Sequence, residues 1–284
     1  MTAATSAEDR LREAQAQLAA TRAPTARGAG PTVERLRAAY LDLLKLALCD
    51  LVGPATTSAG AMPDGTVATR ELEGDGRSVR AAGMDWPPHG LTMVGLTRLD
   101  DLQACVEEVV RDGIAGDLIE AGAWRGGAAL LMRATLDAHG DERTVWVADS
   151  FQGFPAGHAP RAGDADLRGF DLLAVPEEQV RASFARLGYE RGVRFVPGFF
   201  ADTLPALAGE RWALVRLDAD SYDATREALE ALYPGLAPGG HLVVDDYGSF
   251  EGCRRAIDEF RAEHGIDAPL QRVDHTCVRW RRAA

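Results

Sequence analysis

Residues 117–127 read DLIEAGAWRGG, and this stretch decides the fold. Leu118–Ile119 predicts a short buried strand, and the glycines Gly122, Gly126 and Gly127 follow where a helix should begin. Glycines let the backbone approach a ligand closely, and the free N–H groups at a helix N-terminus attract polar groups. The stretch therefore predicts a strand, a ligand-binding turn and a helix in succession.

The downstream sequence repeats this order of strand and helix. Short apolar runs predict strands at Thr144–Ala148, Val193–Val196, Trp212–Leu217 and Gly240–Val244, and amphipathic segments predict helices at Ala128–His139, Ala224–Tyr233 and Cys253–His264. The tail Leu270–Arg281 alternates as an exposed strand does. Strands that alternate with helices predict an α/β fold with a mostly parallel, doubly wound sheet.

The upstream sequence is mainly helical in pattern. Ala7–Arg22 and Val33–Val52 predict helices separated by a break at Ala23–Pro31, and Leu99–Asp112 predicts a further amphipathic helix. The expected inward face of the second helix consists of Leu36, Tyr40, Leu43, Leu44 and Ala47.

A stretch poor in apolar residues, Gly53–Gly90, separates the second of these helices from the third. Its glycine, proline and aspartate content predicts an extended, partly mobile loop. We therefore divide the chain into a helical N-terminal extension (1–32), a helical lid or oligomerisation segment (33–112) and a ligand-binding domain (113–284).

Composition excludes several classes of function. The 284 residues include 31 basic and 43 acidic side chains, and a formal charge of −12 disfavours nucleic acid as a partner. We see neither an apolar run of the ~20 residues that span a membrane nor a signal peptide. The four cysteines lack C-x-x-C spacing, so we expect free thiols in a cytoplasmic protein. Lys45 is the only lysine and is expected at the surface, which argues against a P-loop.

The first candidate site is a cofactor site at two strand ends. Glu120, Gly122 and Gly126 form E-x-G-x-x-x-G, which differs from the dinucleotide pattern G-x-G-x-x-G. A carboxylate there suits a ligand with an ammonium group, such as the methionine part of S-adenosylmethionine. Asp149 ends the next strand, where a carboxylate can accept hydrogen bonds from a ribose diol. The alternative is that both acids are ordinary turn residues.

The second candidate site is a metal site. Asp218 ends one predicted strand, and Asp245 and Asp246 end the next. Carboxylates that converge at one sheet edge repel one another unless a cation lies between them, and oxygen ligands favour Mg²⁺. Asp220 could reach the same place, although it and Asp223 could instead cap the following helix.

Several motifs together resemble the macrocin O-methyltransferase (TylF) family. They are YLDLLKLAL, LTMVGLTRLDDL, DLIEAGAWRGGAALLMRATL, VWVADSFQGFP, FVPGFFADTLP and RLDADSYDATREALEALYPGLAPGGHLVVDDY, in this order between Val33 and Arg281. The resemblance implies a Rossmann-like class I methyltransferase with an N-terminal helical lid. It also implies the use of S-adenosylmethionine and a divalent metal to methylate sugar hydroxyls of glycosylated natural products. The first 30 residues and Thr56–Ala82 have no counterpart in these motifs.

The resemblance also assigns roles to single residues. Asp218, Asp245 and Asp246 would be the Mg²⁺ ligands, and the cofactor would contact Glu120, Gly122, Asp149 and Ser150, with Asp202 near the adenine and Thr92–Met93 covering it. Some relatives carry a histidine, suspected as the base, before a segment like LLAVPEE. Residues 166–175 hold no histidine here, so the base should be Asp220 or, if its loop folds inward, His158.

We therefore expect a cytoplasmic sugar O-methyltransferase of antibiotic-type metabolism that acts on a small glycoside and forms a homo-oligomer. The loop Phe154–Phe170 should close over the acceptor. A catechol-type acceptor is the first alternative, because it also presents two adjacent oxygens. A non-catalytic S-adenosylmethionine-binding protein and an NAD-dependent oxidoreductase are the others.

Overall fold

The structure is a computed structural model, which describes residues 6, 8–12, 15–16, 32–61, 67–154, 160–161, 163–168 and 170–283. Of the expected helix Ala7–Arg22, residues 8–12 and 15–16 are described and are helical. The expected break at Ala23–Pro31 lies outside the described residues.

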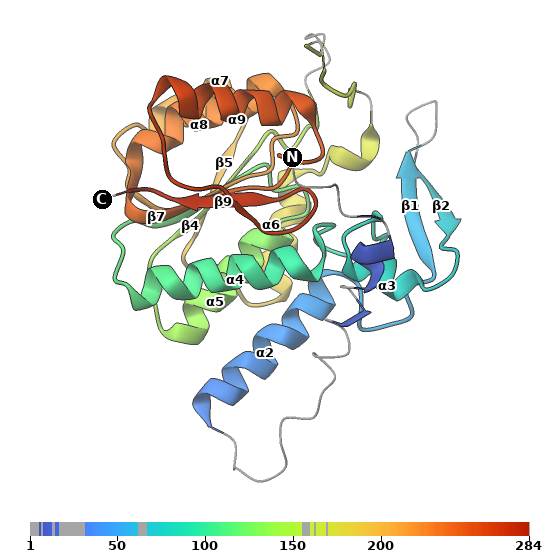
Figure 1. Cartoon of the computed structure of the whole chain (residues 1–284). Coiled ribbons are helices and arrows are strands. Elements are labelled where there is room, and N and C mark those ends of the chain that lie inside the picture. Colours follow the sequence, from blue (N-terminus) through green and yellow to red (C-terminus); the bar gives the residue numbers. More distant parts are fainter. Residues whose placement is uncertain are drawn as a thin grey trace.

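A seven-stranded sheet forms the centre of the molecule, with the strand order β5-β4-β3-β6-β7-β9-β8 (Figure 1). The strands are β3 (Asp117–Ala121), β4 (Val145–Asp149), β5 (Val193–Pro197), β6 (Trp212–Leu217), β7 (Leu236–Val244), β8 (Gln271–Arg272) and β9 (Val278–Arg281). The strands from β5 to β7 are parallel, and β9 runs antiparallel to both of its neighbours. The predicted doubly wound α/β sheet is confirmed.

Helices cover both faces of this sheet (Figure 1). The helices α2 (Val33–Leu48), α4 (Gly95–Arg111), α5 (Gly127–His139) and α6 (Glu177–Arg186) pack on one face, and α8 (Tyr222–Leu232) and α9 (Glu251–Glu263) on the other. Alternating strand residues point to opposite faces. In β6, Leu214 therefore belongs to the first apolar cluster and Val215 to the second.

Shorter helices connect these elements. They are α3 (Gly76–Ala81), α7 (Phe200–Thr203) and the 3₁₀ turns η1 (Asp171–Leu173), η2 (Leu204–Leu207) and η3 (Tyr233–Gly235). The helix α6 lies in a stretch for which the sequence pattern predicted no helix, and its buried side consists of Val180, Ser183 and Phe184.

The expectation of a long loop at Gly53–Gly90 is wrong. This stretch contains the antiparallel hairpin β1 (Thr57–Ala61) and β2 (Val67–Glu71), followed by α3. The hairpin is joined to the domain where the N–H of Ala59 donates to the carbonyl of Trp86 over 2.7 Å. The hairpin is packed through small buried residues such as Ser58 and Ala59. Because such residues are small or polar, the sequence shows no clear hydrophobic pattern there.

Of the expected inward face of α2, only Leu44 is buried. Leu36, Tyr40 and Leu43 are 59%, 41% and 60% exposed, whereas the buried residues include Leu41 and Leu44. The apolar stripe that the sequence shows on α2 therefore faces away from the core.

Other sequence expectations can be checked directly. Lys45 is buried rather than exposed, because it forms ion pairs with Asp100 and Asp42. The four cysteines are buried and free. Within the described ranges, no helix combines the length and apolarity needed to cross a membrane.

Candidate active site

A cleft of about 1050 Å³ opens at the carboxyl ends of the parallel strands. Within the sheet, β3 lies between β4 and β6, so the order of the strands reverses direction at β3. In open α/β sheets, ligands bind at such a switch point. Most of the predicted site residues line the cleft: Thr92, Met93, Glu120, Gly122, Asp149, Ser150, Asp202, Asp218, Asp220, Asp245 and Asp246.

The glycine turn after β3 is tightly constrained. Gly122 has a φ of 91°, and a Cβ atom there would lie 1.8 Å from the carbonyl oxygen of Asp218. Only glycine therefore lets the end of β3 lie against the end of β6. Gly126 does not line the cleft; it precedes α5 with a φ of 84° and lies against Val180 and Phe184.

Glu120 offers one unpaired oxygen at the floor of the cleft. Its side chain is 1% exposed, and Oε1 accepts a hydrogen bond from Arg216. Oε2 is buried and has no hydrogen-bond partner among the described residues. Burial raises the pKa of Glu120 to about 8, although the charge of Arg216 and the backbone N–H of Ala129 lower it, and the charge of Asp218 adds to the rise. A buried acceptor without a partner is costly, so this oxygen fits a cationic ligand.

Asp149 mainly shapes the turn. Its Oδ2 accepts the backbone N–H groups of Ala123 and Trp124 over 2.7 and 3.1 Å, and its Oδ1 accepts that of Phe151 over 2.8 Å. Because a carboxylate oxygen can accept two hydrogen bonds, Oδ1 retains room for one more donor. The neighbouring Ser150 hydroxyl donates to the carbonyl of Gly153 over 2.8 Å.

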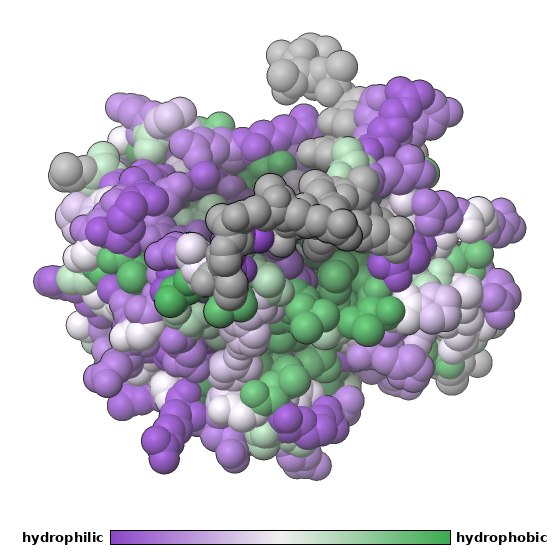
Figure 2. All heavy atoms as spheres, turned by 90° about the horizontal axis from the view of Figure 1, so that it is seen from below, coloured by the Kyte–Doolittle hydropathy of each residue, from purple (hydrophilic) through white to green (hydrophobic). Residues whose placement is uncertain are grey.

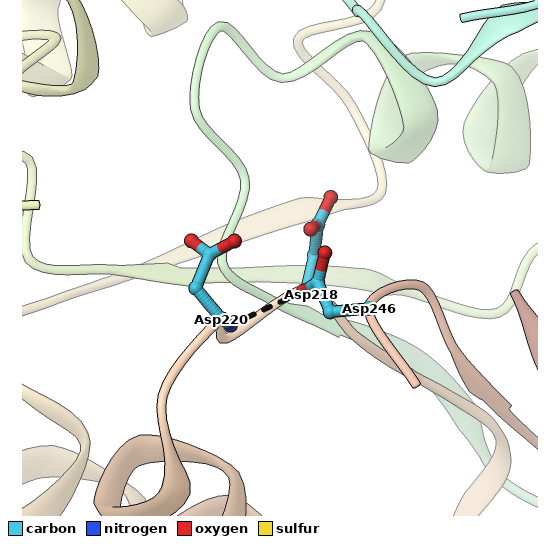
Figure 3. A group of neighbouring side chains, drawn as sticks. All are labelled: Asp218, Asp220 and Asp246. Atoms are coloured by element: carbon cyan, nitrogen blue, oxygen red, sulfur yellow. Dashed lines mark hydrogen bonds between the residues drawn. The ribbon is translucent and has the colours of Figure 1, made fainter. Parts of the chain in front are cut away.

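Three aspartates converge near Glu120, and one of them, Asp218, shares the Arg216 guanidinium with it. Asp218, Asp220 and Asp246 place carboxylate oxygens within 4.8 Å of one another, and Figure 3 shows their side chains pointing to the same side. Burial raises the pKa of Asp220 and of Asp246, and the charges of the neighbouring aspartates raise both further. The cluster therefore has unbalanced negative potential when all three side chains are ionised.

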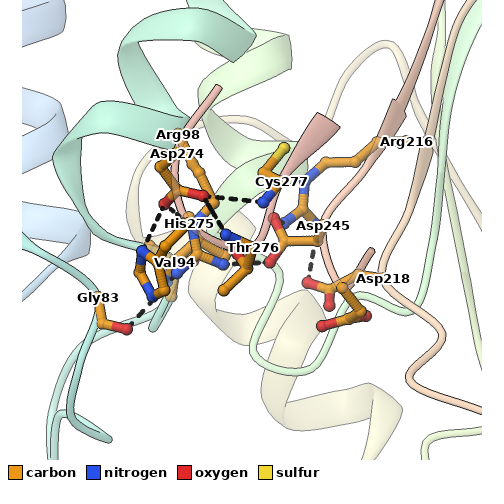
Figure 4. A network of polar contacts seen from close by, with 12 residues as sticks. Gly83, Val94, Arg98, Arg216, Asp218, Asp245, Asp274, His275, Thr276 and Cys277 are labelled. Carbon is orange, nitrogen blue, oxygen red and sulfur yellow. Dashed lines mark hydrogen bonds and ion pairs between the residues drawn. The ribbon is translucent and has the colours of Figure 1, made fainter. Parts of the chain in front are cut away.

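Asp245 has a different environment from Asp246. Arg98 forms an ion pair with its Oδ2, and Arg216 donates to its Oδ1 over 2.5 Å (Figure 4). Burial opposes the ionised form, but the two guanidinium groups outweigh burial and lower the pKa of Asp245. Arg216 also donates to Asp218 over 2.9 Å, so it links the ends of β3, β6 and β7.

Asp220 does not cap the following helix. The side chain of Ser221 is the N-cap of α8 and accepts the N–H of Ala224, while Asp223 pairs with Arg161 at 2.7 Å. Asp220 has a φ of 57°, an uncommon conformation for a residue other than glycine, and its own N–H donates to Asp246 over 3.1 Å. Such strain is typical of functional positions.

The alternative base, His158, lies outside the described residues. The described parts of the loop Phe154–Phe170 border the cleft, as expected of a segment near the acceptor. Three features of the cleft were not predicted from sequence: the arginines Arg98 and Arg216, and the wall formed by the β1–β2 hairpin with Trp86. Arg216 alone had a visible signal, because it is a charge within the buried strand WALVRL.

Comparison with known proteins identifies the family. The family model described as "Macrocin-O-methyltransferase (TylF)" matches residues 55–282. The chain belongs to this family. It is therefore an O-methyltransferase, which confirms the resemblance drawn from the motifs and removes the non-catalytic and NAD-dependent alternatives.

Two curated relatives and one solved structure show how close the similarity is. The chain is 46% identical to "8-demethyl-8-(2,3-dimethoxy-alpha-L-rhamnosyl)-tetracenomycin-C 4'-O-methyltransferase" of Streptomyces olivaceus, over 88% of this chain and 95% of the relative. It is 40% identical to "Mycinamicin III 3''-O-methyltransferase" of Micromonospora griseorubida, over 86% and 96%. The O-methyltransferase NovP has 40% identity and a TM-score of 0.78, over 87% of this chain and all of that one.

Proposed function

We propose that this protein transfers a methyl group from S-adenosylmethionine to a sugar hydroxyl of a glycosylated small molecule, with the help of a divalent cation. The observation that carries the proposal is one cleft that holds both a buried, unpaired carboxylate oxygen on Glu120 and the cluster Asp218, Asp220 and Asp246. The first suits a cationic methyl donor, and the second suits a metal-assisted acceptor site.

The cofactor site would lie over the ends of β3 and β4. S-adenosylmethionine supplies an activated methyl group on sulfur. Glu120 would bind its ammonium group through Oε2, and the spare acceptor capacity of Asp149 Oδ1 would meet the ribose. Ser150 lies beside Asp149, while Thr92–Met93 and Asp202 line other parts of the same cleft, as expected for residues that cover the cofactor.

The acidic cluster fits a hard divalent cation such as Mg²⁺. It offers oxygen ligands only, and their mutual repulsion would be relieved by a positive charge. Asp218 and Asp246 would be ligands, with Asp245 contributing the lone pairs that its two arginines leave free. A cation bound there would orient two neighbouring hydroxyls and lower the pKa of the reacting one.

Asp220 would accept the proton of the acceptor hydroxyl. Burial and the neighbouring carboxylates raise the pKa of Asp220, and a cation bound beside it would lower that pKa and keep the carboxylate ionised, ready to accept the proton. The strained backbone holds its carboxylate beside Asp218 and Asp246 rather than at the helix cap. His158 remains the alternative base.

The acceptor class is supported by the relatives. The named activities of both curated relatives are O-methylations of glycosylated compounds, and the chain covers nearly their whole length. Apolar side chains such as Trp86, Phe154 and Phe170 line the cleft and suit an apolar aglycone. We further propose that the protein acts in the cytoplasm, where its free cysteines would stay reduced.

We also propose that a second copy of the chain packs on α2. Val33, Leu36, Tyr40 and Leu43 are exposed and follow the alternating spacing of three and four residues that pairs helices. Figure 2 shows apolar side chains gathered on the face of the molecule seen from below in Figure 1, where α2 lies.

Two experiments test these proposals. Release of S-adenosylhomocysteine should require both a glycosylated acceptor and Mg²⁺, and full turnover after exhaustive EDTA treatment would exclude the metal. Light scattering should report a dimer or higher oligomer that the Leu36→Glu/Leu43→Glu variant dissociates, whereas Glu34→Gln, on the same helix, should leave it intact. A monomeric wild-type protein would exclude the assembly.

A further inference from the structure

A buried arginine of α4 contacts Asp245, the residue next to Asp246 of the acidic cluster. Arg98 lies in α4, and its side chain is 9% exposed. Its guanidinium pairs with Asp245, directly after β7, and its Nε lies 3.1 Å from Oδ2 of Asp274, which lies between β8 and β9 (Figure 4). One side chain therefore joins α4 to two separate elements of the sheet.

The far partner, Asp274, is fixed by the backbone. Its Oδ1 accepts the N–H groups of Thr276 and Cys277, each over 2.8 Å. Because Asp274 cannot rotate without losing these bonds, its negative charge stays beside Arg98. Arg98 and Arg216 then occupy one oxygen of Asp245 each, which fixes the plane of that carboxylate.

The charges around Arg98 are unbalanced. Arg98 and Arg216 are the guanidinium groups of this network, and they face the carboxyl groups of Glu120, Asp218, Asp245 and Asp274, with those of Asp220 and Asp246 adjacent. Removal of one buried positive charge would increase the repulsion among the remaining carboxylates. It would equally increase the attraction for any added cation.

We propose that Arg98 acts as a built-in counter-ion, so that the acidic cluster stays assembled without a divalent cation. The inference rests on the proposed cation site. It makes the segment 33–112 part of that site, since α4 within this segment supplies the arginine. It also fixes the direction in which substitutions should change cation affinity.

Replacement of Arg98 and of its far partner should have opposite effects. Arg98→Met removes positive charge, so the protein should bind Mn²⁺ about fivefold or more tightly. Asp274→Asn keeps the Oδ1 acceptor but leaves the charge of Arg98 less balanced, so Mn²⁺ should bind more weakly. General damage to the fold would weaken binding in both variants and could not produce opposite signs.

A matched control is available in Arg133. It is 2% exposed, pairs with Asp137 at 2.6 Å and does not line the cleft. Without metal, both Arg98→Met and Arg133→Met should melt at a lower temperature than wild type. Saturating Mg²⁺ should recover more of the loss in Arg98→Met, because tighter binding gives a larger shift. Arg133→Met should gain only the wild-type shift.

Mn²⁺ affinity is measured by electron paramagnetic resonance titration, which needs no acceptor. If wild type binds no Mn²⁺, the proposed cation site is wrong and the inference falls with it. If wild type binds Mn²⁺ but Arg98→Met binds it equally or more weakly, only the role of Arg98 is overturned. Should Arg98→Met fail to fold, Asp274→Asn decides alone, and unchanged or tighter binding in that variant overturns the inference.

Discussion

Cofactor binding should depend steeply on pH because of Glu120. With a pKa of about 8, the free protein at pH 7 holds Glu120 ionised in about one molecule in ten, and at pH 6 in about one in a hundred. Binding of an ammonium group favours the ionised form. Affinity for S-adenosylhomocysteine should therefore fall about tenfold, or ~1.4 kcal/mol, from pH 7 to pH 6.

The effect of pH on fold stability has the opposite sign to its effect on cofactor affinity. Between the unfolded pKa near 4.5 and the folded pKa of about 8, the native state binds more protons at Glu120 than the unfolded state. This residue therefore contributes stability that is lost as pH rises through that window. Bound cofactor should offset the loss, since the ammonium group compensates the ionised carboxylate.

Titration calorimetry with S-adenosylhomocysteine measures both the affinity and the proton release. At pH 7, runs in buffers of different ionisation enthalpy should report close to one proton released per ligand bound. Glu120→Gln should bind more weakly and lose this pH dependence, whereas Glu178→Gln on α6 should retain it. A flat profile in wild type, or an equal slope in Glu120→Gln, would refute the assignment.

Three further outcomes can be checked with single variants. Asp220→Asn should lower kcat by about 10²–10⁴-fold while leaving binding of S-adenosylhomocysteine in place; a change of only a few-fold, with collapse in His158→Ala, would make His158 the base. Asp149→Ala should weaken S-adenosylhomocysteine binding by about 1–3 kcal/mol in calorimetry, and unchanged affinity would leave Asp149 a purely structural residue. Gly122→Ala should lose about 2–5 kcal/mol in chemical denaturation, because its Cβ would meet the Asp218 carbonyl oxygen; a stability equal to wild type would contradict that contact.

The elements of the sheet were predictable because they are strongly apolar. The predicted strand Trp212–Leu217 matches β6 at both ends, since each of its residues is buried. The hairpin β1–β2 was missed because its strands, TSAGA and VATRE, carry few large apolar residues. The helix α6 was missed for a related reason, since only Val180, Ser183 and Phe184 are buried in it.

The apolar face of α2 shows a different limit. Periodicity indicated that Leu36, Tyr40 and Leu43 share one side of the helix, which is correct. It could not indicate what that side packs against, and the structure leaves it exposed. The helix instead buries Leu41, Leu44 and Leu48 against the domain. It therefore carries two apolar stripes, and periodicity alone does not show which one is buried.

In the site, acids were easier to find than their partners. A carboxylate directly after an apolar strand marks the sheet edge where ligands bind, and this rule placed Glu120, Asp218 and Asp245 in one cleft. Arg98 lies 147 residues from Asp245 and on a helix whose pattern indicates only packing. Long-range ion pairs of this kind have no local sequence signal.

The position of the transferred methyl group tests the central proposal most directly. The purified protein is incubated with Mg²⁺, S-adenosylmethionine that carries a trideuterated methyl group, and a glycosylated small molecule. Tandem mass spectrometry then locates the label. The proposal predicts the deuterated methyl group on the sugar fragment, and none in either fragment when EDTA replaces Mg²⁺. A label on the aglycone fragment, or equal labelling with EDTA, would contradict it.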